Sequence, residues 1–218
     1  MAEMTKPTLG QLARELTAAM PSLSGEEARL ALALYGRLAR AEPVSIAELA
    51  THVELDEERV RAVVERWNGV YRDDGGRVVG FWGVSIPRMP HQFVVAGRTL
   101  HTWCAWDALF IPQLMGTRAE VESSPPSGGE RVRARVSPRA IEEVSPPTTV
   151  VSMLSPTSGF DAYVIRSFCH YVHFFPTPQD AEPWMAEHPN AFLLSVHEAF
   201  ELGQLTNRAR FGSALDDP

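Results

Sequence analysis

The sequence is poor in cysteine and in positive charge, and each shortage excludes a class of protein. Only two cysteines occur in 218 residues, and a chain of this length with 44% hydrophobic positions can form a core without disulfide bonds. The 20 lysines and arginines are outnumbered by 27 acidic residues, for a formal net charge of −7. Nucleic acids and anionic membranes are therefore disfavoured as partners, because both attract clustered basic side chains.

Long apolar runs are also missing. Residues 1–16 carry charges and a proline where a signal peptide needs an unbroken apolar stretch, and no window approaches the length of a membrane span. We therefore expect a cytoplasmic protein, in which two cysteines are more often a metal or catalytic pair than a structural disulfide. Phosphate-loop, dinucleotide-binding and serine-hydrolase motifs are absent as well.

The first part of the chain, residues 1–86, is predicted to be helical with a terminal hairpin. Apolar spacing and capping residues predict helices over residues 8–20, 26–40, 46–53 and 57–67, with Ser24, Ser45 and Asp56 as caps. An Asp-Gly-Gly turn then separates two strand-forming runs within residues 69–86. This order resembles a winged helix-turn-helix. Its candidate recognition helix begins with acidic residues, which favours a structural use of the module over DNA binding.

Residues 87–218 are predicted to form a second module, and the whole chain an α+β fold. The segments expected there are a strand pair within 91–101 that turns at Ala96-Gly97, a hairpin within 119–136, a strand within 148–154 that continues the same sheet, a helix running into a strand within 160–175, helices over 178–188 and 195–212, and a frayed tail over 213–218.

Cys104 and Asp107 stand three positions apart in an apolar stretch, residues 101–110. If this stretch is helical, the two side chains share one face, with Cβ atoms about 5–6 Å apart. Apolar neighbours raise a carboxyl pKa because they disfavour the ion. Spacing does not show whether the second cysteine, Cys169, joins them. Each cysteine also fits a buried space-filling role, and Asp107 a helix cap.

Histidines offer a rival metal site in the second module. Five of them lie there: His91, His101, His170, His173 and His197. In a strand, His170 and His173 would point to opposite faces, and His197-Glu198 lacks the second histidine of the zinc-protease pattern. Zinc catalysis is therefore disfavoured. Aromatic residues beside the cysteines, notably Trp103 and Phe168, are more often core residues than substrate contacts, and we keep these two as substrate-binding candidates.

Three separated motifs resemble the organomercurial (alkylmercury) lyases in order and spacing. They are LHTWCAWDALFIPQLMGTRAEVES, RSFCHYVHFF and SVHEAFELGQLTNR, within residues 98–210. The family has a catalytic cysteine and aspartate in a W-C-x-x-D motif, which correspond here to Cys104 and Asp107. Its second catalytic cysteine, in an S-F-C motif, corresponds to Cys169. The resemblance implies protonolysis of a carbon–mercury bond, giving a hydrocarbon and Hg(II) without an organic cofactor. Low-molecular-weight thiols and a mercuric reductase are the implied acceptors of the metal.

This chemistry suits the residue types. Mercury is soft and prefers thiolate sulfur, so two cysteines can hold it as substrate and product. A carboxyl group in an apolar pocket can take a thiol proton and return it to the leaving carbon. The chain departs from the family at His170, where some members have another cysteine, and at His101, where many have tyrosine. Two other hypotheses stay open: a thiol protein that only binds a soft metal such as copper, and a winged-helix DNA-binding regulator.

Overall fold

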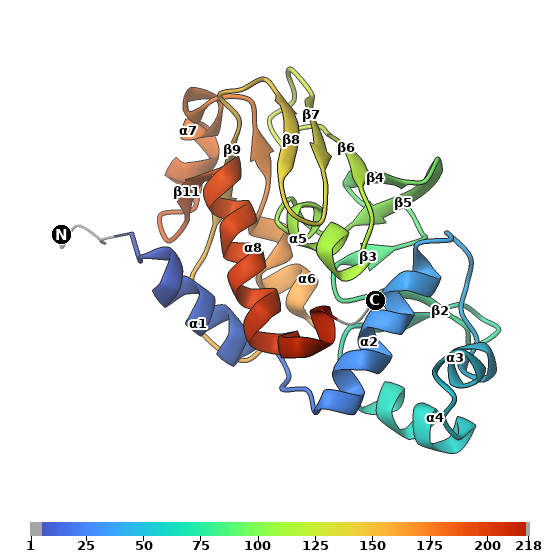
Figure 1. The fold of residues 1–218 in the computed structure, drawn as a ribbon. Coiled ribbons are helices and arrows are strands. Elements are labelled where there is room, and N and C mark those ends of the chain that lie inside the picture. The colour runs from blue at the N-terminus through green and yellow to red at the C-terminus, as the bar shows by residue number, and fades with distance from the viewer. Residues whose placement is uncertain (1–5, 217–218) are drawn as a thin grey trace.

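Eight α-helices and two antiparallel sheets make up residues 6–216, the part of the chain that this computed structural model describes (Figure 1). The predicted α+β class is confirmed. The helices are α1 (Leu9–Ala19), α2 (Gly25–Leu38), α3 (Ile46–Val53), α4 (Glu57–Arg66), α5 (Asp107–Leu114), α6 (Val164–Ser167), α7 (Pro178–Glu187) and α8 (Val196–Phe211), with 3-10 helices η1 (Cys169–Tyr171) and η2 (Gly212–Leu215). No helix in this range is both long and apolar enough to cross a membrane.

The larger sheet has eight strands in the order β1-β2-β3-β5-β4-β6-β7-β8. These are β1 (Val70–Arg72), β2 (Val78–Phe81), β3 (Val84–Ser85), β4 (His91–Val95), β5 (Arg98–Thr102), β6 (Ala119–Ser123), β7 (Val132–Val136) and β8 (Ile141–Ser145). A second sheet has the order β10-β9-β11, with β9 (Val150–Met153), β10 (Phe174–Phe175) and β11 (Phe192–Ser195). The prediction that 148–154 continues the first sheet is therefore wrong, because β9 pairs with β10 and β11 instead.

Local signals in the sequence correspond to the observed element boundaries. Ser24 and Ser45 each form a capping box at a helix start, and the Asp56 carboxylate accepts backbone N–H groups at the start of α4. The β4–β5 hairpin turns at Ala96-Gly97, as predicted, and both residues have a positive φ. In β7 the side chains alternate between buried and exposed, which places its arginines toward solvent.

The N-terminal helices and the later strands share one sheet and one core. β2 pairs with β3, and β3 pairs with β5, so the larger sheet crosses the predicted module boundary at residues 86 and 87. Figure 1 shows α1 beside α8, and these two helices are in contact. The order of α2, α3, α4 and the β1–β2 hairpin is as expected, but the winged-helix interpretation and the division into two modules stay predictions.

Helix α8 is the central support of the site region. It contacts α1, α2, α5 and the sheets, and its Gly203 lies against Phe110 of α5. A Cβ at Gly203 would come within 2.5 Å of the Phe110 Cβ. The Trp106 indole N–H donates to the Ala199 carbonyl (3.0 Å), and the Asn207 amide donates to the Phe110 carbonyl (3.1 Å). These contacts hold the segment that carries Cys104 and Asp107 against α8.

Two expectations for the C-terminal half need correction. The segment 160–175 does run from helix to strand, but it breaks at Phe168 into η1, so His170 lies in a 3-10 helix and His173 precedes β10. The two histidines therefore do not share a strand. The predicted tail also begins with structure, since η2 extends to Leu215, and residues 217–218 lie outside the described range.

We expect Gly203→Ala to lower the free energy of unfolding by about 1–3 kcal/mol, because the added methyl group overpacks the contact with Phe110. The matched control is Gly36→Ala, at an exposed position in α2 where a Cβ meets nothing within 4 Å. That change should raise stability by about 0.5–1 kcal/mol. Denaturant unfolding of both variants checks the prediction, and equal shifts for the two would contradict it.

Candidate active site

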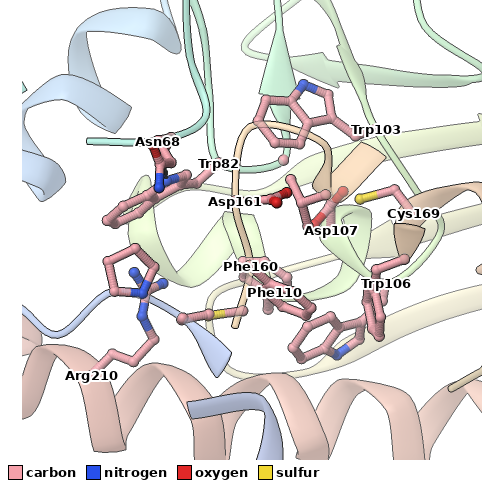
Figure 2. A pocket seen from close by; sticks show the side chains of 15 residues that line it. Asn68, Trp82, Trp103, Trp106, Asp107, Phe110, Phe160, Asp161, Cys169 and Arg210 are labelled. Atoms are coloured by element: carbon pink, nitrogen blue, oxygen red, sulfur yellow. Dashed lines mark hydrogen bonds between the residues drawn. The ribbon is translucent and has the colours of Figure 1, made fainter. Parts of the chain in front are cut away.

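An apolar cavity lies between α5, α8, the β2–β3 turn and the segment that carries Cys169 (Figure 2). It encloses about 530 Å³ of atom-free space, its opening to solvent included. Asp107 and Cys169 contribute to its wall, together with both predicted substrate contacts, Trp103 and Phe168. The remaining wall is mostly apolar and includes the aromatic residues Trp82, Trp106, Phe110 and Phe160, which suits a small apolar group.

Cys104 lies in a turn before α5, not on the helix itself. The helix begins at Asp107, so the condition for a shared helical face of Cys104 and Asp107 is not met. The Asp107 Oδ2 atom accepts a hydrogen bond from the Cys104 backbone N–H (2.9 Å), and the Thr102 hydroxyl donates to the Cys104 carbonyl (3.0 Å). A short side chain that bonds to nearby backbone competes with helix formation, which accounts for the turn. The two residues are neighbours because of this turn.

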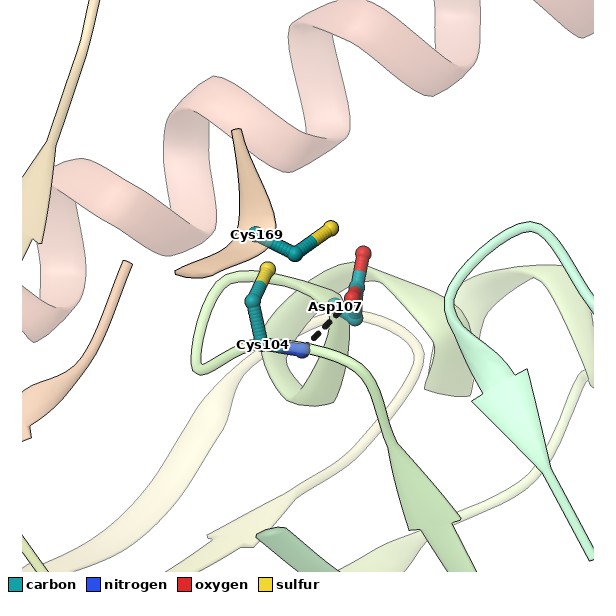
Figure 3. Close-up of side chains that lie close together, drawn as sticks. All are labelled: Cys104, Asp107 and Cys169. Carbon is teal, nitrogen blue, oxygen red and sulfur yellow. Dashed lines mark hydrogen bonds between the residues drawn. The ribbon is translucent and has the colours of Figure 1, made fainter. Parts of the chain in front are cut away.

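Cys169 reaches the same place from far along the chain. It opens η1 after the break at Phe168, and the Ala105 backbone N–H donates to the Val172 carbonyl (3.1 Å), which ties the two segments together. One ligand atom from each of Cys104, Asp107 and Cys169 lies within 4.8 Å of the other two (Figure 3). All three side chains are buried. The structure thus brings together the three residues singled out in the sequence, whose roles stay a prediction.

Burial controls the protonation of this cluster. It raises the pKa of Asp107 to about 7, and the hydrogen bonds from Cys104 offset only part of that effect. Burial, with Cys169 and Asp107 nearby, also places the pKa of Cys104 well above its usual range. The Cys104 thiol lowers the pKa of Cys169 by hydrogen bonding, but burial and the charge of Asp107 outweigh this and leave it raised. At neutral pH the thiols keep their protons, and Asp107 readily gains or loses one.

Gly83 permits the close packing of the β2–β3 turn against Asp107. Its φ is +101°, and a Cβ there would come within 2.6 Å of the Asp107 Oδ1 atom. The preceding Trp82 also has a positive φ, of 27°, which a tryptophan rarely adopts. The Gly83 carbonyl accepts a hydrogen bond from the Trp103 backbone N–H (2.9 Å). Backbone strain therefore lies directly beside the carboxyl group.

Several cavity residues were not predicted from the sequence. Trp82, Gly83 and Arg210 line the cavity, as do Phe110 and Phe160. Trp82 and Gly83 lie in the predicted hairpin, and Arg210 lies in the last turn of α8, so only tertiary packing reveals their position. His101 and His170 are not cavity-lining residues. Within residues 6–216, no histidine joins the group that could hold a metal ion.

Comparison with known proteins identifies the family. The model of the alkylmercury lyase family (MerB) matches residues 84–206, which include all three clustered residues. The chain is 43% identical to an alkylmercury lyase of Bacillus cereus over 173 residues, which cover 79% of this chain and 78% of the relative. The chain belongs to the alkylmercury lyase family. The similarity to an alkylmercury lyase of Streptomyces lividans, 35% over 196 residues, covers 89% of this chain and 90% of that one.

The alkylmercury lyase fold extends over nearly the whole chain. A crystal structure of the mercury-bound form of MerB2 superposes with a TM-score of 0.72, at 22% identity, over 93% of this chain and 98% of that one. The N-terminal helices, which lie before the family match begins, are therefore part of a shared architecture. They pack through α1 and α2 against α8, which supports the site.

We expect the stability of the wild type relative to Asp107→Asn to fall as pH rises from about 4 to about 7. The folded pKa of Asp107, about 7, exceeds its ordinary value of 3.8, so in this window the folded state binds more protons than the unfolded state. The free energy of unfolding of the wild type, relative to that of Asp107→Asn, should fall by about 4 kcal/mol at most. Denaturant unfolding across this pH range measures it, and parallel curves for the two proteins would refute the raised pKa.

Proposed function

We propose that this alkylmercury lyase cleaves carbon–mercury bonds by protonolysis and releases a hydrocarbon and Hg(II). In this proposal Cys104 and Cys169 bind the mercury, and Asp107 carries the proton. The observation that carries it is the meeting of two sulfurs and one carboxyl oxygen within 4.8 Å, buried beside an apolar cavity. Two thiolates are the ligands that a soft metal prefers, and the cavity offers space for its hydrocarbon group.

The first step is an exchange of thiols on the substrate. An organomercurial in a cell carries a small thiolate, and Cys169, which lies in the cavity wall, is placed to replace it. The Cys169 sulfur bonds to mercury, and its proton leaves with the displaced small thiol. The Cys104 thiol hydrogen-bonds to Cys169 and offsets part of the rise in its pKa that burial and Asp107 cause, which favours Cys169 as the first ligand.

The second step brings in Cys104 and loads the proton carrier. Asp107 accepts the Cys104 proton, and the Cys104 thiolate then bonds to the same mercury. The Asp107 Oδ2 atom already accepts the Cys104 backbone N–H, so Oδ1 is the oxygen available for the proton. With a pKa of about 7, Asp107 can both take a proton and return it at neutral pH.

The third step breaks the carbon–mercury bond. Two thiolates donate electron density to mercury, and the bonded carbon becomes more basic. Asp107 delivers its proton to that carbon, the electron pair of the carbon–mercury bond forms the new carbon–hydrogen bond, and the hydrocarbon leaves. Hg(II) stays on Cys104 and Cys169 until two small thiols replace them and return their protons. Every proton in this sequence comes from a thiol, so the reaction as written requires no organic cofactor.

Further parts of the proposal concern partners and place. Trp103 and Phe168 lie in the cavity wall and would contact the hydrocarbon group. Low-molecular-weight thiols would remove Hg(II), and a mercuric reductase would be its later acceptor. We place the activity in the cytoplasm, because the mechanism requires both cysteines in the reduced state.

The N-terminal module, residues 1–86, is proposed to be winged-helix-like and to have a structural use beside the catalytic module, residues 87–218. Arginines of its candidate recognition helix are engaged by acids: Arg59 binds Glu26 through two nitrogens, and Arg66 binds Glu27. Neutralised side chains of this kind attract phosphate weakly. The acidic start of α4 points the same way, so DNA-binding regulation is disfavoured.

Product analysis tests the proposal. With methylmercury and excess thiol, the wild type should release methane and inorganic mercury, because all three groups of the cluster are present. Cys104→Ala, Cys169→Ala and Asp107→Asn should each lose most of this activity, by about 100-fold or more where the proton carrier is removed. Gas chromatography and mercury speciation give the two products.

The matched control for the carboxyl group is Asp74→Asn, at an exposed position in the β1–β2 turn, which should keep wild-type activity. Normal turnover by either cysteine variant would rule out the mechanism. Tight binding of mercury by the wild type without any hydrocarbon release would instead favour a thiol-based soft-metal-binding protein.

A further inference from the structure

Arg210 is a partly buried residue, and two nitrogens of its guanidinium group are buried without hydrogen-bond partners in the part of the chain that the structure describes. Its Nε and Nη2 atoms are closed off from solvent and have no partner within residues 6–216. It also takes no part in the ion pairs found in that range. A buried cation without a partner is costly, so a fold that keeps one needs a compensating interaction.

Aromatic rings supply part of the compensation. The Arg210 Cζ atom lies 4.5 Å from the ring centroid of Trp82 and 5.1 Å from that of Phe211. Trp82 is itself fixed, since the Tyr35 hydroxyl donates to its carbonyl (2.8 Å) and its indole N–H donates to the Asn68 carbonyl. Burial lowers the pKa of Arg210 to about 10, so the group stays charged at neutral pH. The rings lie against its faces, and the Nε and Nη2 atoms of its N–H edge stay buried and unpaired among the described residues.

That edge has the geometry that binds a carboxylate. Elsewhere in this chain Arg59 uses the same two atoms, Nε and Nη2, to hold both oxygens of Glu26 at 2.8 and 2.7 Å. A guanidinium presents two parallel N–H groups that match a carboxylate, which makes such a pair stronger and more directional than a single hydrogen bond. The atoms that Arg59 uses for this purpose are the ones that Arg210 leaves unpaired.

Arg210 lies in the same cavity as the reacting groups. In Figure 2 it is at the end formed by Trp82 and Asn68, and Asp107 and Cys169 are at the other end. The wall between them includes Phe110 and Phe160, which are apolar, and the exposed Asp161, whose Oδ1 atom accepts the Tyr163 backbone N–H (2.8 Å) (Figure 2). A molecule with its mercury at Cys169 would extend along this wall toward the guanidinium.

We propose that Arg210 binds a carboxylate of the mercury adduct and makes this chain favour substrates that carry one. The carboxylate belongs either to the hydrocarbon group or to the thiol bound to mercury, and the guanidinium turns its N–H edge toward the open cavity to meet it. This inference rests on the proposed function. It makes Arg210 a specificity-determining residue, with no part in the proton transfer.

Two arylmercurials that differ in one carboxylate test the inference. In 2-mercaptoethanol, a neutral thiol, Arg210→Met should raise the KM for 4-(chloromercuri)benzoate by about 10- to 100-fold, since a charge-assisted pair is lost. The KM for phenylmercury chloride, and kcat for both, should stay unchanged. Arg208→Met, an exposed position one half-turn earlier on α8, is the control and should alter neither substrate.

A change of thiol separates the two sources of carboxylate. The KM for phenylmercury is measured again with 3-mercaptopropionate in place of 2-mercaptoethanol. If Arg210→Met raises the KM only with 3-mercaptopropionate, Arg210 recognises the carboxylate of the thiol. The inference is overturned if Arg210→Met changes the KM equally for every pair of substrate and thiol, or changes none of them. If the wild type releases neither benzene from phenylmercury nor benzoate from 4-(chloromercuri)benzoate, the proposed function fails instead.

Inhibition of the wild type provides a test that needs no variant. Benzoate should compete with phenylmercury, and benzamide, which has the same shape without the charge, should inhibit at least tenfold less. Arg210→Lys keeps the charge but loses the paired N–H edge, so it should retain only part of the benzoate inhibition. Equal inhibition by benzoate and benzamide would contradict carboxylate binding even if Arg210→Met failed to fold.

Discussion

The site depends on the contact between two segments that are far apart in the chain. The turn at Cys104 is closed by the Asp107 carboxylate, and the Ala105 N–H joins that turn to the Val172 carbonyl just after Cys169. Neither hydrogen bond involves a sulfur atom. The backbone therefore places both thiols and the carboxyl group before any substrate is bound, so binding mercury does not require the ordering of these segments.

Burial makes the same arrangement reactive. The cluster lies under aromatic side chains, where a charged carboxylate is disfavoured and the pKa of Asp107 rises to about 7. In water a carboxyl group at neutral pH has already lost its proton and could not protonate carbon. The strained Trp82-Gly83 turn that packs on Asp107 helps to maintain this apolar environment, and Gly83 leaves the space that the carboxyl group occupies.

Much of the fold and the three clustered residues could be predicted from the sequence, because their signals are local or lie in motifs. Ser24, Ser45 and Asp56 mark helix starts through their own side chains, and the Ala96-Gly97 turn depends on its own backbone angles. The turn at Cys104 could not be told from a helix, since the apolar pattern of residues 101–110 does not show that Asp107 bonds back to the backbone. The partners of β9 and the position of Arg210 depend on tertiary packing, to which no local pattern responds.

The central claim is that Cys104 and Cys169 bind one mercury atom together. X-ray absorption spectroscopy of the protein with one equivalent of Hg(II), after removal of small thiols, measures this directly. The account predicts two sulfur ligands for mercury in the wild type and a single one from the chain in each of Cys104→Ser and Cys169→Ser. A wild-type spectrum with one protein sulfur, or two sulfurs that persist in either variant, would contradict it.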